Sequence, residues 1–216
     1  MARATDTKGA CDIALYNGAE VIIESDIPGC QGYLRLPFDK PQARGEIGMT
    51  YDWGRDEDRT WEMVFRLKHG GRGTILSNDP DIPDDQRYVE GFGFGLPQTG
   101  DFFVQPADAD TPTRLLGVRE SDVNTAIYVT ISYVANGDEL TVTWRKAGDS
   151  DTRFAKIPSS EGNLAGSWLI IGGAGHDLFS GRDRIAEIEV HHFATYSEIL
   201  DEVAIRQRLR VLKFES

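Results

Sequence analysis

Two neighbouring segments of this sequence alternate apolar and polar residues on either side of an Asn-Gly pair, and this feature constrains the fold most. Residues 126–133 carry Ile, Val, Ile and Tyr at every second position, and residues 139–146 carry Leu, Val and Trp in the same way. A period of two is typical of a β-strand with one buried face. Asn136 and Gly137 tolerate the positive φ angles of a type I′ turn. The pattern therefore predicts an antiparallel hairpin over residues 126–146.

The same period recurs along most of the chain. Residues 61–67 alternate Trp, Met, Phe and Leu with Glu, Val and Arg. Shorter runs between glycine and proline turns predict further strands at residues 20–25, 45–51, 73–78, 88–95, 101–105, 114–118, 153–157, 168–172 and 185–193. About twelve short strands predict an all-β sandwich, a jelly roll of two packed antiparallel sheets.

One helix is predicted near the C-terminus. Thr195 and Glu198 have the spacing of a capping box. Acidic residues follow in the first turns of this segment and arginines in the last, which complements the helix dipole. Ile199, Val203 and Leu209 provide an apolar side that can pack on a sheet.

Composition restricts the class of partner. The chain has 216 residues, with 23 basic and 35 acidic side chains and a formal net charge of −12. This charge repels phosphate backbones and argues against nucleic acid as a partner. Hydrophobic residues make up 40% of the chain, which is too many for a disordered segment. We predict a single sandwich domain over residues 18–216, preceded by an N-terminal arm at residues 1–17.

No run of apolar residues approaches the roughly 20 that a membrane helix requires, and the first residues lack the apolar centre of a signal peptide. We therefore expect a protein made in the cytosol that reaches other surfaces by another route, such as an assembled virus particle. Cys11 and Cys30 are the two cysteines. Reduced thiols are favoured in the cytosol, and a disulfide between the two stays open as the alternative.

The run at residues 91–96 alternates glycine with large apolar residues. A strand with this pattern has one face without side chains, which leaves room for a close neighbour or a ligand. Tight packing within the sheet or a bend of the strand is the alternative interpretation.

Four motifs in a characteristic order resemble the concanavalin A-like lectin/glucanase superfamily, and within it the laminin-G-like and pentraxin-like modules. They are Trp61-Glu-Met-Val-Phe-Arg-Leu, Gly73-Thr-Ile-Leu-Ser-Asn, the hairpin of residues 127–144, and Trp168-Leu-Ile-Ile-Gly-Gly with the following Phe179-Ser-Gly and Ile185-Ala-Glu-Ile-Glu-Val. The resemblance covers residues 18–212. It departs from the family pattern at Arg-Asp-Arg before Ile185, a longer spacing than usual, which puts the register of the last strand in doubt.

The resemblance implies a sandwich fold and a carbohydrate- or protein-binding role, but this fold also carries hydrolases and lyases. Glycosidases of the superfamily carry Glu-x-Asp-x-x-Glu on one strand. Glu187 and Glu189 match the first two positions, whereas His192 occupies the third. Strand parity places His192 on the opposite face, so the catalytic acid is missing and a non-enzymatic protein is predicted. By the same parity His191 and His192 point in opposite directions and would not share a metal ion.

An acidic loop follows the strand at residues 73–78 and is the best candidate for a metal site. Carboxylates in a proline-stiffened loop are the ligands that calcium prefers. Laminin-G-like modules use such rim loops for calcium, as the resemblance implies. The candidate ligands are Asp79, Asp81, Asp84 and Asp85. A solvated acidic loop without calcium is the alternative.

Sugar sites combine an aromatic platform with carboxylates and amides. Tyr51 and Trp53 lie beside several aspartates, and Tyr88, Phe102 and Phe103 lie near the acidic loops. These five residues are the candidate ligand-binding residues, and burial in the core is the alternative for each. The sequence favours a non-enzymatic lectin-like module on a virion surface, a capsid decoration or tail-associated protein that contacts glycans or virion proteins and could form a homo-oligomer. A free carbohydrate-binding lectin and a divergent polysaccharide hydrolase or lyase are the alternatives.

Overall fold

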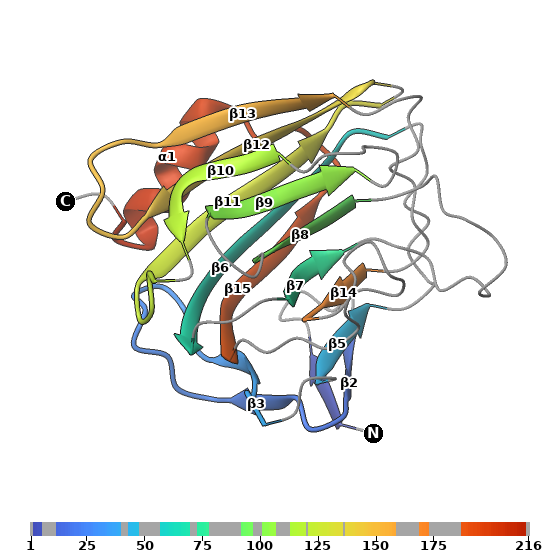
Figure 1. Cartoon of the computed structure of the whole chain (residues 1–216), viewed down its shortest axis with the longest axis vertical. Helices are drawn as coiled ribbons and strands as arrows, with labels where there is room; N and C mark the ends of the chain where they lie inside the picture. The colour runs from blue at the N-terminus through green and yellow to red at the C-terminus, as the bar shows by residue number, and fades with distance from the viewer. Residues whose placement is uncertain are drawn as a thin grey trace, which may run out of the picture.

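The computed structural model describes residues 2–5, 12–39, 43–47, 57–69, 73–77, 92–96, 101–106, 113–119, 121–135, 137–158, 169–172 and 187–214. These residues form two antiparallel sheets that face one another, with a helix on the outside of one sheet (Figure 1). The prediction of an all-β sandwich with a short C-terminal helix is thereby confirmed. No helix in the described ranges is both long enough and apolar enough to span a membrane.

One sheet has eight strands and contains the N-terminal segment. Its strand order is β1 (Ala2–Thr5), β2 (Asp12–Tyr16), β5 (Arg44–Ile47), β14 (Leu169–Ile171), β7 (Gly73–Ser77), β8 (Phe92–Leu96), β9 (Asp101–Pro106) and β10 (Thr113–Arg119). We expected residues 1–17 to be an arm outside the sandwich. Instead β2 pairs with β5 from Ile13 to Tyr16, so this segment extends the edge of the sheet.

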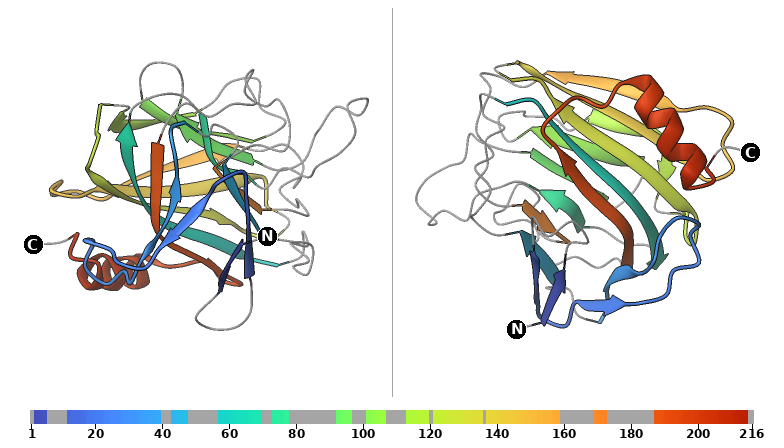
Figure 2. Two further views of the ribbon diagram at one scale, coloured as in Figure 1. Left: turned by 90° about the horizontal axis from the view of Figure 1, so that it is seen from below. Right: turned by 180° about the vertical axis from the view of Figure 1, so that it is seen from behind.

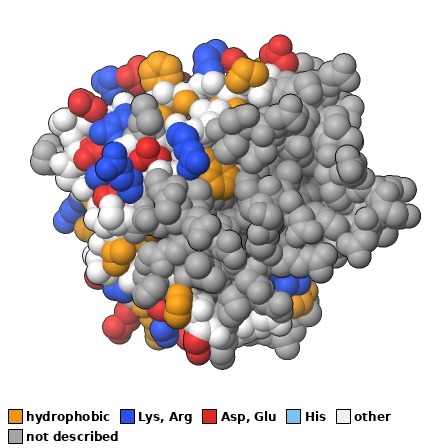
Figure 3. All heavy atoms as spheres, in the orientation of Figure 1, with side chains coloured by type: hydrophobic (Ala, Val, Ile, Leu, Met, Phe, Trp, Pro, Cys, Tyr) orange, Lys and Arg blue, Asp and Glu red, His pale blue; other side chains and the backbone are white. Residues whose placement is uncertain are grey.

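The other sheet has seven strands and carries the polar site described below. Its strand order is β13 (Arg153–Pro158), β12 (Glu139–Lys146), β11 (Ala126–Tyr133), β6 (Arg59–His69), β15 (Glu187–Tyr196), β4 (Tyr33–Leu36) and β3 (Glu20–Ile22). The predicted hairpin is confirmed, because β11 and β12 pair in register from Ile127 opposite Lys146 to Tyr133 opposite Leu140. β13 forms one edge of the sheet, and hydrophobic and charged side chains lie side by side over it (Figure 3).

The core lies between the two sheets and follows from the alternation of the strands. Trp61 and Phe65 point inward from β6, and their rings lie 5.0 Å from Phe92 and 5.6 Å from Phe94 of β8. The large residues of β8 thus fill the core, while its glycines permit close approach on the other side of the strand. A Cβ at Gly95 would lie only 2.7 Å from the carbonyl oxygen of Gly73. Tight packing within the sheet is therefore the correct interpretation at Gly95.

A third layer covers part of the outer face of the seven-stranded sheet. The helix α1 (Glu202–Val211) lies against this face, as the view from behind shows (Figure 2). A second apolar cluster joins the two layers. Its buried members are Val64 and Tyr128 of the sheet, Ile27, and Leu200, Ile205, Leu209, Leu212 and Phe214 of the helical region. Residues on the outer face of β6 and β11 are therefore buried as well as those on the inner face.

The helix begins later than the predicted capping box. Thr195 belongs to β15, which continues to Tyr196, so it cannot cap a helix. Asp201 is the actual N-cap, and its side chain accepts a hydrogen bond of 2.7 Å from the Ala204 amide. Pairing of β15 with β6 down to Thr60 keeps the chain extended beyond the point at which local sequence favours a helix.

Candidate functional site

Most residues predicted to bind a ligand or a metal lie outside the described residues. This holds for Tyr51, Trp53, Tyr88 and for the four aspartates of the acidic loop, Asp79, Asp81, Asp84 and Asp85. Phe102 and Phe103 are described. The Phe102 ring is fully buried and lies 5.5 Å from Phe65, so it belongs to the core and offers no face to a ligand. Phe103 is 5% exposed.

The described polar site lies on the outer face of the seven-stranded sheet, where a β-bulge in β15 changes the direction of the side chains. Val190 pairs with Phe65 and His192 with Val64, so His191 has no partner residue of its own on β6. A bulge of this kind places neighbouring side chains on the same face. The expectation that His191 and His192 point in opposite directions is therefore wrong, and both join Glu187 and Glu189 on the outer face.

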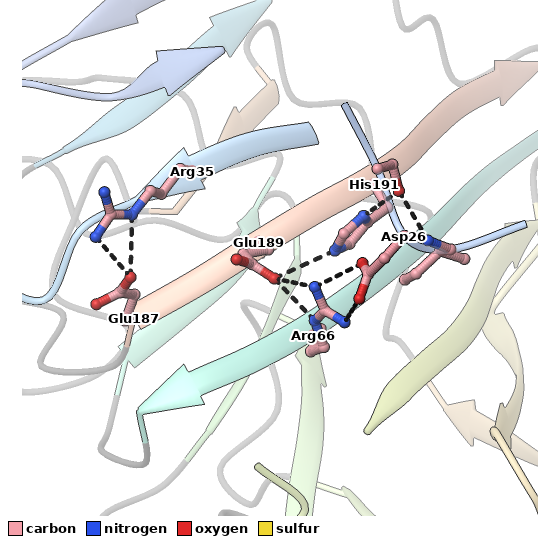
Figure 4. A network of polar contacts seen from close by, with 8 residues as sticks. Asp26, Arg35, Arg66, Glu187, Glu189 and His191 are labelled. Carbon is pink, nitrogen blue, oxygen red and sulfur yellow. Dashed lines mark hydrogen bonds and ion pairs between the residues drawn. The ribbon is translucent and has the colours of Figure 1, made fainter. Parts of the chain in front are cut away.

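Arg66 is the centre of the first polar network, which we call the Arg66 network (Figure 4). Its guanidinium donates two hydrogen bonds of 2.8 Å to Asp26 and one of 2.8 Å from Nε to Glu189. His191 continues the network, because its Nε2 atom lies 3.4 Å from Glu189 and its Nδ1 atom lies 2.8 Å from the Ser25 hydroxyl. The segment before β4 thus contacts the sheet through polar groups.

The contacts of this network shift the pKa values of Asp26, Arg66 and His191. The hydrogen bonds from Arg66 lower the pKa of Asp26, and those to Asp26 and Glu189 raise the pKa of Arg66 despite its partial burial. Burial lowers the pKa of His191, and the nearby Arg66 charge lowers it further. The ring is consequently neutral at pH 7, with Arg66 and Asp26 charged.

Glu62 is the centre of a second network, which we call the Glu62 network. This carboxylate is 1% exposed. It accepts hydrogen bonds of 2.8 Å from the Tyr128 hydroxyl and 2.6 Å from the Tyr196 hydroxyl, and His192 Nε2 lies 3.0 Å away. Arg208 of α1 lies 3.4 Å from the same carboxylate. Its guanidinium also lies over the Tyr196 ring, 4.5 Å from the centroid.

Burial alone would raise the pKa of Glu62, but hydrogen bonds from His192, Tyr196 and Tyr128 outweigh it, and the pKa lies below its ordinary value of 4.5. Burial and the Glu62 charge raise the pKa values of both tyrosines. Glu62 is thus a charged, hydrogen-bonded group that links three elements of the outer face, namely β11, β15 and α1.

Glu187 and Glu189, which match part of the glycosidase pattern, each form an ion pair with an arginine. Arg35 of β4 lies 3.0 Å from Glu187, and Arg66 contacts Glu189 at 2.7 Å. An outward-facing glutamate on a strand is usually solvated, but Glu189 is only 5% exposed because the segment containing Asp26 lies over it. Among the described residues, no group of three or more His, Cys, Asp or Glu side chains could hold a metal ion. These ion pairs join β4, β6 and the segment around Asp26 to β15.

Sequence reasoning did not find Glu62, Arg66 and Tyr128 as members of a site. The signal was present, since the alternation in β6 and β11 already puts these three polar side chains on the face opposite the core. Polar residues at such positions are usually solvated. Their burial depends on α1 and on the segment around Asp26, which are distant in sequence and not predictable from the strands themselves.

Comparisons with known proteins define the fold. No protein-family model matches the chain, and no curated protein matches it either. Solved structures with the same fold include the binding domain of botulinum neurotoxin DC in complex with SialylT, at 12% identity and a TM-score of 0.59 over 96% of this chain and 48% of that one. The complex of that domain with rat synaptotagmin II matches at 10% identity and 0.59 over 96% and 48%. The binding domain of botulinum neurotoxin serotype C1 matches at 14% identity and 0.60 over 96% and 49%.

The chain spans about half the length of these solved chains. At this level of identity the likeness shows the fold. These neighbours are binding domains of neurotoxins. The chain therefore shares the β-sandwich fold of these binding domains.

Proposed function

We propose that this chain is a non-enzymatic, lectin-like recognition module that binds glycans. The observation that supports the proposal is the fold, which matches binding domains over nearly the whole chain. The occupation of Glu187 and Glu189 by Arg35 and Arg66 supports the non-enzymatic part. One neighbour is described in complex with SialylT and another with rat synaptotagmin II, so a protein surface is the other class of partner that this fold accommodates.

A glycan array tests the proposal. The purified chain is labelled, applied to a printed array of animal and microbial glycans, and the strongest spots are confirmed by calorimetric titration with the free oligosaccharide. We expect a reproducible, saturable signal on a chemically related group of glycans. Absence of binding on the array, with and without calcium, contradicts the glycan proposal. Release of reducing ends or unsaturated sugars from polysaccharides contradicts its non-enzymatic part.

Calcium is part of the proposal through the acidic loop. Asp79, Asp81, Asp84 and Asp85 offer the oxygen ligands that calcium requires. We propose that calcium bound there supports glycan binding, and the array is therefore repeated after chelation with EDTA and after calcium is restored. Replacement of Asp81 and Asp84 by Asn is expected to remove the calcium dependence, and a signal that never responds to EDTA contradicts it.

We further propose a virion surface as the setting, with the chain as a capsid decoration or tail-associated protein made in the cytosol. This proposal depends on the sequence alone. Cosedimentation with virus particles in a density gradient tests it, together with the oligomeric state from light scattering. A chain recovered only as a free monomer, apart from any particle, favours the alternative of a free lectin.

A further inference from the structure

The outer face of β12 and β13 carries an exposed aromatic residue beyond the cover of α1. The inner face of both strands is in the core, where Leu140 and Val142 are fully buried and Ile157 is 2% exposed. The residues that alternate with these three along each strand therefore point to the outer face. The register places Thr143 of β12 opposite Phe154 of β13, and Thr141 opposite Lys156. These four side chains form a small two-by-two array, which we call the Phe154 face.

Phe154 is 73% exposed, although it lies within a strand and not in a loop. A strand fixes the position of the ring, so its exposure is a property of the sheet surface and does not come from a disordered turn. Val134 and Phe38, which are also exposed, follow the ends of strands, whereas Val21 lies within β3 and is 45% exposed. Phe154 is thus an aromatic side chain that a strand presents to solvent.

Hydrogen-bonding groups surround this ring. The Thr141 and Thr143 hydroxyls lie on the neighbouring strand, and Lys156 is two positions further along β13, in an ion pair with Glu139. On the other side Thr152 is 3.4 Å from the guanidinium of Arg145. The exposed Phe154 ring therefore lies among side chains that donate and accept hydrogen bonds.

This combination fits a sugar ring. A pyranose has one face of C–H groups, which packs on an aromatic ring, and a rim of hydroxyls, which both donate and accept hydrogen bonds. Thr hydroxyls can do both, the Lys ammonium donates and the Glu carboxylate accepts. Aromatic surfaces with a few convergent polar groups are the usual composition of sites that orient a small ligand.

The area argues against a protein partner on this face. A stable dimer buries about 800 Å² on each partner, whereas one aromatic side chain contributes roughly 150–250 Å². A second copy could instead pair with the free edge of β13, but a charged residue such as Lys156 on an edge strand opposes that pairing. The described surface therefore fits a ligand of one or two sugar rings better than a second protein.

We propose that the Phe154 face is a glycan-binding subsite, in which the apolar face of a pyranose stacks on Phe154 while Thr143 and the Lys156–Glu139 pair bind its hydroxyls. This inference rests on the proposed function and assigns glycan binding to a place on the seven-stranded sheet. It differs from the sequence-based candidates, because it uses neither the aromatic residues near the acidic loops nor calcium.

The experiment compares variants by titration with the oligosaccharide of the strongest array spot. Phe154→Ala is expected to weaken binding about tenfold or more, and Phe154→Trp to keep it, because the larger ring preserves stacking. Thr143→Val, which keeps the shape but removes the hydroxyl, is expected to weaken it about threefold to tenfold. Phe38→Ala is the matched control. Phe38 is an aromatic residue that is 46% exposed, and it follows β4, which lies near the edge of the sheet opposite β13.

Each outcome separates the inference from the proposed function. If the wild type binds a glycan and Phe154→Ala binds it equally well, the Phe154 face is wrong and the glycan function stands. If the wild type binds no glycan, the proposed function fails, and the inference fails with it. If light scattering shows a wild-type dimer that Phe154→Ala converts to a monomer, the face is a contact between copies and the sugar assignment is overturned.

Discussion

The Tyr196 hydroxyl donates a hydrogen bond of 2.6 Å to Glu62, and this contact joins the end of β15 to the middle of the outer face. Tyr128 donates to the same carboxylate, and Arg208 brings α1 to it. Glu62→Ala would leave the buried Tyr128 hydroxyl and the half-buried Tyr196 hydroxyl without an acceptor, and the Arg208 guanidinium without this carboxylate. We expect the free energy of unfolding to fall by about 3–5 kcal/mol.

Urea denaturation followed by tryptophan fluorescence measures this change. Glu202→Ala is the control, because Glu202 is exposed and pairs with Arg206 one turn along α1. Such a pair contributes about 0.5 kcal/mol or less. Equal losses in the two variants would show that the Glu62 network does not hold the helix to the sheet.

The pH dependence of stability follows from the same carboxylate. Its pKa is lower in the folded protein than its ordinary value of 4.5. A depressed pKa means that the unfolded chain binds more protons, so this contribution is present above pH 4.5 and is lost as the pH falls through the folded-state value. We expect the stability difference between the wild type and Glu62→Gln to be largest at pH 7 and to close towards pH 3. Urea titrations at pH 7, 5, 4 and 3 measure it, and a constant difference would contradict the assignment.

Arg66 neutralises a buried carboxylate, and its loss should be costly. Glu189 is 5% exposed and contacts Arg66 at 2.7 Å. Arg66→Met leaves that carboxylate without its ion-pair partner, and we expect a loss of about 3 kcal/mol. Asp26 is mostly exposed, so Asp26→Asn should cost less than about 1 kcal/mol.

The double variant Arg66→Met with Glu189→Gln tests the reason for this loss. If an unpaired buried charge is the cause, removing the charge should recover at least half of the lost stability, measured by the same urea titration. A double variant no more stable than Arg66→Met would instead point to lost packing of the arginine side chain.

Gly172 and Gly148 form a matched pair for backbone strain. Both have positive φ angles, +88° and +89°. A Cβ at Gly172 would lie 2.3 Å from Leu36 Cδ1 and 3.2 Å from the Ala43 carbonyl, whereas a Cβ at Gly148 meets nothing within 4 Å. Gly148→Ala is expected to cost about 1–2 kcal/mol from the left-handed backbone alone, and Gly172→Ala about 1–3 kcal/mol more from the clash in the core. Thermal and urea unfolding of the two variants measure the difference, which would vanish if the core around Leu36 adapted freely.

Cys30 carries a free thiol beside the end of α1. Burial raises its pKa to about 11 from an ordinary value of 9.0. Alkylation requires the thiolate, so at pH 8 the folded protein should react with iodoacetamide about 100-fold more slowly than the urea-unfolded chain. Mass spectrometry of the Cys30 peptide over time measures both rates. Equal rates in the folded and unfolded chain would contradict the packing of Cys30 against the helix.

Much of the fold was predictable because the local alternation of apolar and polar residues agrees with the final sheets. The hairpin of residues 126–146 shows this, since β11 and β12 pair in the register that puts their apolar residues on one buried face. β1, β2 and β4 were not predicted as strands. These segments are short, and their strand conformation depends on pairing with β5 and β15, which lie far along the chain.

The polar site was less predictable than the fold. Strand parity correctly places Glu187 and Glu189 on the outer face, but it fails at His192, because one bulged residue reverses the parity of everything after it. No local sequence signal marks that bulge. It is visible only in the pairing of β15 with β6, which places Val190 opposite Phe65 and His192 opposite Val64.

The sequence by itself determined that this protein is an all-β sandwich. A period of two in apolar residues gives each sheet one apolar face, and in a chain made almost entirely of strands only a second sheet can cover that face. Only the tertiary structure decided what happens on the opposite face. There, α1 and the segment around Asp26 cover Glu62 and Glu189, while Phe154 stays exposed. Whether an outward side chain is buried depends on which distant element packs over it, and that is a property of chain topology rather than of local pattern.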